Sequence, residues 1–155
     1  MTHAATIREH IDAILPDLIA MRRDLHAHPE LGYEEHRTSG VIRDVLTSAG
    51  IEHVGDLAGG TGVLGHLPGT AAKAVGLRAD IDALPIVEQT GLAWASTHEG
   101  RMHACGHDGH TTILAGTARV LAELAKTEPL PNPVRFLFQP AEEGGGGGER
   151  MVQDG

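Results

Sequence analysis

Residues 103–110 read His-Ala-Cys-Gly-His-Asp-Gly-His and hold the only cysteine of the 155-residue chain beside three of its eleven histidines. Thiolate, imidazole and carboxylate are the groups with which proteins bind divalent transition metals. Five such side chains occur within eight residues, and Gly106 and Gly109 allow the backbone to bend. The segment therefore predicts one half of a metal site.

A carboxylate from elsewhere in the chain should complete this site. The candidates are Glu142 and Glu143, which follow Gln139-Pro140-Ala141 directly after an apolar stretch. Adjacent carboxylates on an extended segment point to opposite sides. One of them can therefore bind metal while the other faces water, which is the division of labour that metal-assisted hydrolysis requires. We predict that the donor atoms of Cys105, His107 and Glu143 converge on one point.

The spacing of Cys105 and His107 depends on local structure. In a helix these two side chains would point to different faces, whereas in a loop both can face one ion. Gly106 and Gly109 favour a loop. Thiolate and imidazole suit Zn²⁺, and carboxylates extend the choice to Mn²⁺, Co²⁺ or Ni²⁺. The alternative is a histidine-rich helix cap beside a buried structural cysteine.

Other polar residues are interpreted as partners of these groups. We expect His103, Asp108 and His110 to orient the ligands by hydrogen bonds rather than to bind metal themselves. Asp80 and Asp82 lie on the same side of a strand end, where they either support a ligand histidine or cap the turn before Pro85.

Three helices are predicted from apolar residues at helical spacing, over residues 4–27, 34–49 and 111–126. Pro16 either kinks the first helix or begins a second segment there. His26 and His28, near the end of this helix, are interpreted as interacting with its dipole. Gly50 should end the second helix.

Three strands are predicted between and after these helices. Residues 62–67 and 74–79, joined by Pro68 and Gly69, are consistent with a hairpin, and residues 134–138 form a third strand. Alternating helices and strands predict an α/β fold with a mixed sheet flanked by helices. Residues 144–148, all glycine, should form a mobile or tightly bent loop. The chain reads as one domain, and its last residues follow a helix start with no closing element, which is typical of a truncated sequence.

Composition excludes several classes of function. The 12 basic and 21 acidic residues give a net charge of −9, which argues against nucleic acid or an anionic membrane as a partner. No signal peptide or membrane span is found, and a single cysteine makes a cytoplasmic location the default. Residues 60–65 match the glycine pattern of dinucleotide-binding proteins. That pattern must open a helix, whereas the residues around it here are strand-like, so we reject a dinucleotide site.

Four segments together resemble the amidohydrolase branch of the aminoacylase/carboxypeptidase superfamily of metallopeptidases. They are RRDLHAHPELG at 22–32, RADIDALP at 78–85, MHACGHDGH at 102–110 and QPAEEG at 139–144. That branch includes hippurate hydrolases and the plant auxin-conjugate hydrolases. The resemblance runs from about residue 20 to the last residue.

The resemblance implies a zinc-exopeptidase-like catalytic domain that binds two divalent ions. Cys105 would lie in the region that bridges the ions, His107 and Glu143 would be further ligands, and Glu142 would be the general base. The substrate would be an N-acyl amino acid, hippurate-like, whose amide C–N bond is cleaved.

Members of this branch also carry an inserted lid domain, which mediates dimerisation, and two more histidine ligands. The resemblance thus implies that residues 1–155 are the N-terminal portion of the catalytic domain, and that a homodimer forms only in a full-length chain. Two functions stay open: a hydrolase or part of one, and a catalytically inactive metal-binding or vestigial protein.

Overall fold

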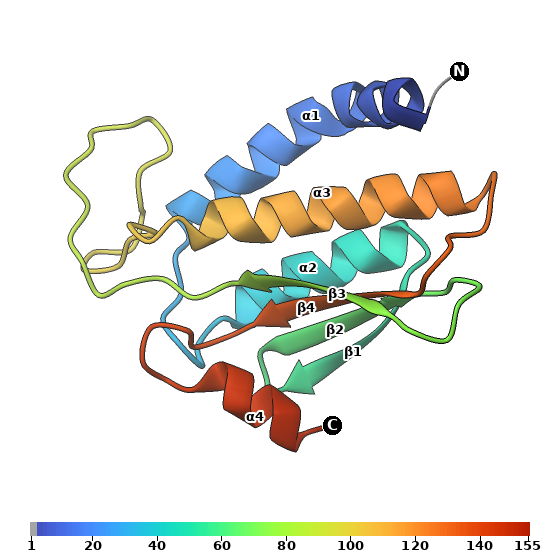
Figure 1. Ribbon diagram of the computed structural model, residues 1–155. Coiled ribbons are helices and arrows are strands. Elements are labelled where there is room, and N and C mark those ends of the chain that lie inside the picture. Colours follow the sequence, from blue (N-terminus) through green and yellow to red (C-terminus); the bar gives the residue numbers. More distant parts are fainter. Residues whose placement is uncertain (1–2) are drawn as a thin grey trace.

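The computed structural model describes residues 3–155, which form helices packed around one sheet (Figure 1). In chain order these are α1 (His3–Ala27), α2 (His36–Ser48), β1 (Glu52–Leu57), β2 (Gly62–Leu67), β3 (Val75–Asp80), α3 (His107–Ala125), β4 (Val134–Gln139) and α4 (Gly147–Gln153). Within these described residues, no helix has the length and apolar character to cross a membrane.

The strands form one mixed sheet in the order β1-β2-β4-β3. β1 pairs with β2, and β2 with β4, in antiparallel fashion, while β3 and β4 are parallel. The predicted α/β class with a mixed sheet is therefore confirmed.

The predicted hairpin between residues 62–67 and 74–79 is wrong, because β4 lies between β2 and β3. The connection after β2 instead packs against the residues that lead into β4. A Cβ at Gly69 would lie 2.2 Å from the backbone of Asn132, and Val75 N donates to Pro133 O at 2.8 Å. The Pro68-Gly69 signal marks the turn correctly, but it cannot show that a strand from later in the sequence enters between its two arms.

Sequence patterns gave no indication of β1. Its residues alternate between exposed and half-buried, with no fully buried side chain to mark a core-facing side. Its pairing with β2 is also irregular between Val54 and Leu57, where Asp56 has a positive φ of 61°. β2 therefore pairs with β1 on one side and with β4 on the other, and not with β3 as predicted.

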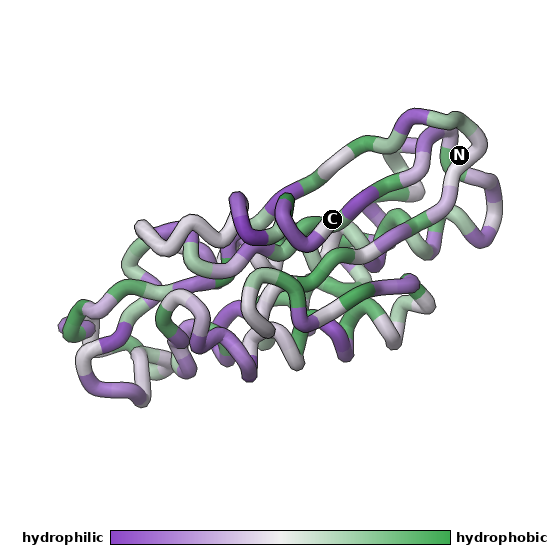
Figure 2. The backbone as a smooth tube through the Cα atoms, turned by 90° about the horizontal axis from the view of Figure 1, so that it is seen from below, coloured by the Kyte–Doolittle hydropathy of each residue, from purple (hydrophilic) through white to green (hydrophobic). Residues whose placement is uncertain are grey.

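The helices are arranged in layers on the sheet. α2 and α3 pack on one face, α1 packs on α3, and α4 lies below the sheet near β4 (Figure 1). Phe136 and Phe138 of β4 are fully buried in a core with residues of the neighbouring strands and of α2 and α3. Hydrophobic and hydrophilic residues alternate along much of the chain, as one-sided burial of helices and strands requires (Figure 2).

The helices differ from those expected in three respects that bear on the prediction. α1 continues through Pro16 as one helix, so no second segment begins there. α3 begins at His107 rather than at residue 111. The glycine run is bent only up to Gly146, because Gly147 and Gly148 already belong to α4. The last two differences both affect the residues with metal-binding side chains.

Candidate metal centre

The candidate site lies where the parallel strands β3 and β4 end. Asp80 is the last residue of β3, and the chain reaches Glu142 shortly after β4 ends at Gln139. α3 begins beside the same edge of the sheet, and Thr111 Oγ1 donates to Asp80 O at 3.1 Å. The carboxyl ends of strands are where open α/β sheets commonly bind ligands.

Gly106 separates the loop from α3. Its φ of 86° lies in the left-handed region, which glycine adopts without the steric penalty of a Cβ. Gly109 N and His110 N donate back to Gly106 O at 2.9 and 3.2 Å, so the helix starts immediately. The predicted loop therefore holds for Cys105 but ends at Gly106, and Gly109 is helical.

Cys105, His107 and Glu143 bring their donor atoms within 4.8 Å of one another. The three residues come from the loop, the first turn of α3 and the turn after β4. His107 is buried, Cys105 half-buried and Glu143 exposed, so the group opens to solvent on one side. The structure places these side chains together as the sequence analysis expected, while their role as ligands stays a prediction.

His107 is held in one orientation by Asp82. His107 Nδ1 lies 3.0 Å from Asp82 O and 3.1 Å from Asp82 Oδ1. Since both of those oxygens accept hydrogen bonds, Nδ1 carries the proton in the neutral ring and Nε2 keeps a free lone pair. Nε2 faces Asp80 Oδ2 at 3.5 Å and Glu142 Oε2 at 3.9 Å.

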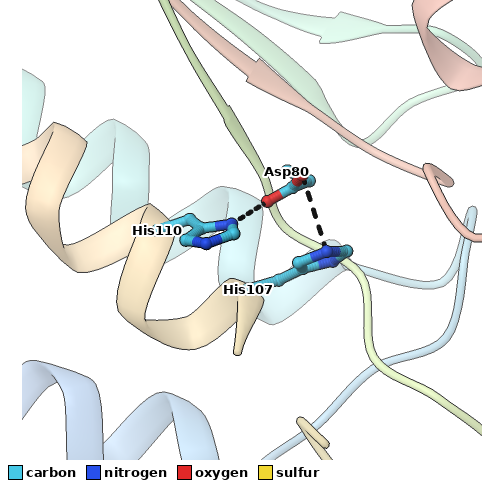
Figure 3. Close-up of side chains that lie close together, drawn as sticks. All are labelled: Asp80, His107 and His110. Atoms are coloured by element: carbon cyan, nitrogen blue, oxygen red, sulfur yellow. Dashed lines mark hydrogen bonds and ion pairs between the residues drawn. The ribbon is translucent and has the colours of Figure 1, made fainter. Parts of the chain in front are cut away.

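Asp80 also contacts a second histidine (Figure 3). Its Oδ1 lies 2.5 Å from His110 Nδ1, and Asp80, His107 and His110 form another group of donors within 4.8 Å of one another. Asp80 and Asp82 were expected either to support a ligand histidine or to cap the turn before Pro85, and in the structure both contact histidines. Asp80 and His110 also have the geometry to bind metal themselves, which the sequence analysis did not expect.

Burial and charge act on the ionisable groups of this cluster. Desolvation raises the pKa of the Cys105 thiol, and the carboxylates of Glu143 and Asp82 raise it further. Desolvation would raise the pKa of Asp80 as well, but the hydrogen bond with His110 and the nearby His107 outweigh it and lower that pKa below its usual value. Asp80 also pairs with Arg78 at 3.1 Å.

Glu142 and Glu143 occupy a turn rather than the extended segment assumed from the sequence. Gly144 N donates to Glu142 O at 2.7 Å, which closes the turn, and Glu143 N donates to Asp82 Oδ2 at 3.0 Å. In this geometry the side chains do not separate to opposite sides. Glu143 joins Cys105 and His107, and Glu142 approaches the same histidine.

Asp108 contacts a different set of residues from the one expected. Its Oδ2 lies 2.7 Å from His26 Nδ1 and 3.0 Å from Arg22 Nε, and His26 Nε2 lies 3.3 Å from Glu88 Oε1. Asp108 thus ties the end of α1 to the start of α3, and His26 contacts two carboxylates, those of Asp108 and Glu88, in addition to any effect of the helix dipole.

His103 is buried without a hydrogen-bond partner for either ring nitrogen among residues 3–155. Desolvation is the main cause that lowers its pKa to about 4. The expected hydrogen bond from His103 to a ligand is therefore not present in the described structure.

Glu35 is a buried acidic residue that the sequence analysis missed. Its carboxylate reaches Ala141 N, directly before Glu142, at 2.9 Å. A glutamate beside a predicted helix start is usually a solvated capping residue, so nothing in its local sequence marks it.

The family model for peptidase family M20/M25/M40 matches residues 76–155. Among curated relatives, the N-acetyl-L-cysteine deacetylase of Bacillus subtilis is 46% identical over 147 residues, covering 94% of this chain and 35% of its own length. An N-acetyldiaminopimelate deacetylase of Streptococcus sanguinis is 48% identical over 142 residues, which cover 90% of this chain and 37% of that protein.

A solved structure agrees with these sequence matches. It is a Bacillus subtilis protein described as a dinuclear metal-binding peptidase of the M20 family, with a TM-score of 0.85 and 45% identity over 92% of this chain and 39% of that one. The present chain thus spans little more than a third of the length of these three relatives. By its sequence match and its fold, the chain belongs to peptidase family M20/M25/M40.

Proposed function

We propose that residues 1–155 form the metal-binding part of a hydrolase that cleaves the amide bond of N-acyl amino acids. The observation that carries this proposal is the convergence of Cys105, His107 and Glu143 within 4.8 Å, beside Glu142. The names of the two deacetylases support a small N-acylated amino acid as the substrate, and the description of the solved relative supports two metal ions.

The residues present fit a divalent ion by their donor chemistry. A thiol, an imidazole nitrogen with a free lone pair and a carboxylate suit Zn²⁺, and the further carboxylates suit Mn²⁺, Co²⁺ or Ni²⁺. Asp80, Asp82, Glu142 and Glu143 also concentrate negative charge around one buried histidine, and a cation would offset that charge. A bound ion would supply Lewis-acid chemistry, polarising the amide carbonyl and lowering the pKa of water.

The chain's own residues would orient this chemistry and move the proton. Asp82 holds the proton of His107 on Nδ1 and directs Nε2 into the site. The Glu142 carboxylate lies 3.9 Å from that nitrogen and is 40% exposed, so water and substrate can reach it. We assign Glu142 as the general base that accepts a proton from water and returns it to the leaving nitrogen.

The narrower part of the proposal concerns the acyl group. A hippurate-like substrate has an aromatic acyl group, whereas the deacetylases are named for acetyl groups. Comparing hydrolysis of N-benzoylglycine with that of N-acetylated amino acids tests this choice directly.

Exchanging the two glutamates separately tests the assignment of roles. In a full-length protein that contains these residues, Glu142→Gln should retain metal and lower kcat by about 10²- to 10⁴-fold, the usual contribution of a general base. Glu143→Gln should instead weaken metal binding. Glu149→Gln, in α4 of the same segment, is the matched control and should change neither quantity. Near-normal turnover by Glu142→Gln would contradict the assignment.

The second candidate is a metal-binding protein without catalysis. The observation that favours it is the same group of donors within 4.8 Å of one another, since such a group can hold an ion without catalysing hydrolysis. This candidate would be supported over the hydrolase if both the 155-residue chain and a full-length protein that contains it bound metal but showed no chelator-sensitive hydrolysis.

A further inference from the structure

Glu35 is a fully buried carboxylate that does not serve its own helix. It occupies the N-cap position of α2, yet it makes no side-chain capping hydrogen bond there. Glu30 does that instead, because its two carboxylate oxygens accept from Arg37 N at 2.9 Å and Thr38 N at 2.8 Å. The Glu35 side chain is therefore free to act on a distant part of the chain.

Both oxygens of Glu35 accept hydrogen bonds from residues far along the sequence. Oε1 accepts from Ala141 N at 2.9 Å, and Oε2 accepts from Thr61 Oγ1 at 2.8 Å. Desolvation raises the pKa of Glu35, and the charge of Asp82 adds to that effect. Burying a carboxylate beside another acid is costly unless its hydrogen bonds return comparable free energy. These two bonds are thus the structural reason for an acid at this position.

Ala141 is held in a conformation that alanine seldom adopts. Its φ is 50°, and it is almost completely buried immediately before Glu142. Glycine neighbours leave room for it, since a Cβ on Gly32 would lie 3.1 Å, and one on Gly145 2.6 Å, from Ala141 atoms. A positive φ at a residue with a side chain persists only where its surroundings enforce it. The hydrogen bond from Ala141 N to Glu35 is such a restraint.

The peptide on the other side of Glu142 is held by a second carboxylate. Glu143 N donates to Asp82 Oδ2 at 3.0 Å, and Asp82 also holds His107. Glu35 and Asp82 therefore bracket Glu142 through backbone amides. We propose that Glu35 is a positioning residue, which fixes the Ala141 peptide and thereby places Glu142 and Glu143 against Cys105 and His107. This inference rests on the proposed function for the roles of those four residues.

A Co²⁺ titration and amide hydrogen exchange of the chain test this role together. Glu35→Met removes both acceptors at similar size, and we expect it to weaken Co²⁺ binding about 10-fold or more, as for other groups that orient ligands. In the metal-free Glu35→Met protein, the backbone amides of Ala141 and Glu143 should exchange hydrogen faster than in the metal-free parent protein. Glu30→Gln is the matched control, because it alters a carboxylate that also holds two backbone amides but lies at the start of α2. It should change neither readout.

Glu35→Gln is a second variant, which keeps the test decisive if Glu35→Met does not fold. A neutral acceptor bonds more weakly than a carboxylate, so this variant should be intermediate in Co²⁺ affinity and in Ala141 and Glu143 exchange. The inference would be overturned if the Glu143 amide of a folded Glu35 variant exchanged at the same rate as in the parent protein. It would also be overturned if Glu35→Met bound Co²⁺ as tightly as the parent protein does. If the parent chain binds no Co²⁺, the proposed metal site fails, and amide exchange still decides the positioning role by itself.

Discussion

Asp82 connects the three proposed ligands through one residue. Its carbonyl oxygen lies 3.0 Å from His107 Nδ1 and 3.6 Å from Cys105 Sγ. Its carboxylate contacts His107 Nδ1 and accepts the hydrogen bond from Glu143 N. A residue that contacts every member of a metal-binding group, without being one, sets their relative positions.

Asp82→Asn should therefore weaken metal binding by about 10- to 100-fold, the usual effect of removing a group that orients metal ligands. The asparagine can offer only one oxygen, so its amide group would face either the proton on His107 Nδ1 or the Glu143 amide. Competition with a chromophoric chelator measures the affinity.

Asp154→Asn is the control for this substitution. Asp154 Oδ2 also accepts a backbone hydrogen bond, from Ala58 N at 2.6 Å, but it lies in the last residues of the chain away from the cluster. Equal affinities of the Asp82→Asn and parent proteins would show that Asp82 does not organise the site.

The residues with metal-binding chemistry were predictable because their types are informative without coordinates. Cys105, His107 and Glu143 were selected by donor chemistry and the structure brings them together. The direction of Asp108 toward His26, and the isolation of His103, were not predictable. The direction of Asp108 depends on how α1 packs against α3, and no local pattern encodes that contact.

Helices were predicted better than the pairing of strands. The periodicity of α1 and α2 is contained within each segment, so local sequence is sufficient for their prediction. The order of the sheet depends on β4, which is distant in sequence from the strands that it separates. The early start of α3 depends on Gly106, whose left-handed conformation permits an abrupt entry into the helix.

Among the glycines of the turn between β4 and α4, Gly147 has the closest approach to the backbone. A Cβ on Gly147 would lie 1.8 Å from Pro140 O, so the backbone would have to move. The adjacent Gly148 faces the flexible end of Gln139 at 2.9 Å, which can rotate away. We expect Gly147→Ala to lower the free energy of unfolding by at least about 1–3 kcal/mol, the usual cost of overpacking.

Urea denaturation of Gly147→Ala and Gly148→Ala measures this difference. Gly148→Ala should be close to neutral, because alanine is also the better helix former. Equal stabilities of the two variants would mean that the turn after β4 is not tightly packed, and would remove one of the restraints on Glu142 and Glu143.

At the scale of the whole molecule, the exposed apolar residues of α1 are the most distinctive surface. Ile7, Ile11, Leu15 and Ile19 are each 37–44% exposed and recur every four residues, which places them on one side of the helix. Ile113 of α3, 68% exposed, shares with Ile7 and Ile11 a groove of about 300 Å³. Apolar surface of this kind usually marks an interaction site or a tendency to associate.

We therefore expect the purified 155-residue chain to self-associate. Ile11→Lys together with Ile19→Lys should reduce association, as light scattering after size-exclusion chromatography would detect. Val152→Lys is the control, because Val152 is 80% exposed on α4, away from this face. A parent chain that stays monomeric at high concentration would contradict the expectation.

The central claim is that Cys105, His107 and Glu143 bind one metal ion together. X-ray absorption spectroscopy of the Zn²⁺-loaded chain tests it most directly, since it distinguishes sulfur ligands at about 2.3 Å from nitrogen or oxygen ligands at about 2.0–2.1 Å. We predict one sulfur with nitrogen and oxygen ligands, and loss of the sulfur signal in Cys105→Ser. A zinc ion with nitrogen and oxygen ligands alone in the parent chain would contradict the account and favour Asp80, His107 and His110 as the metal-binding group.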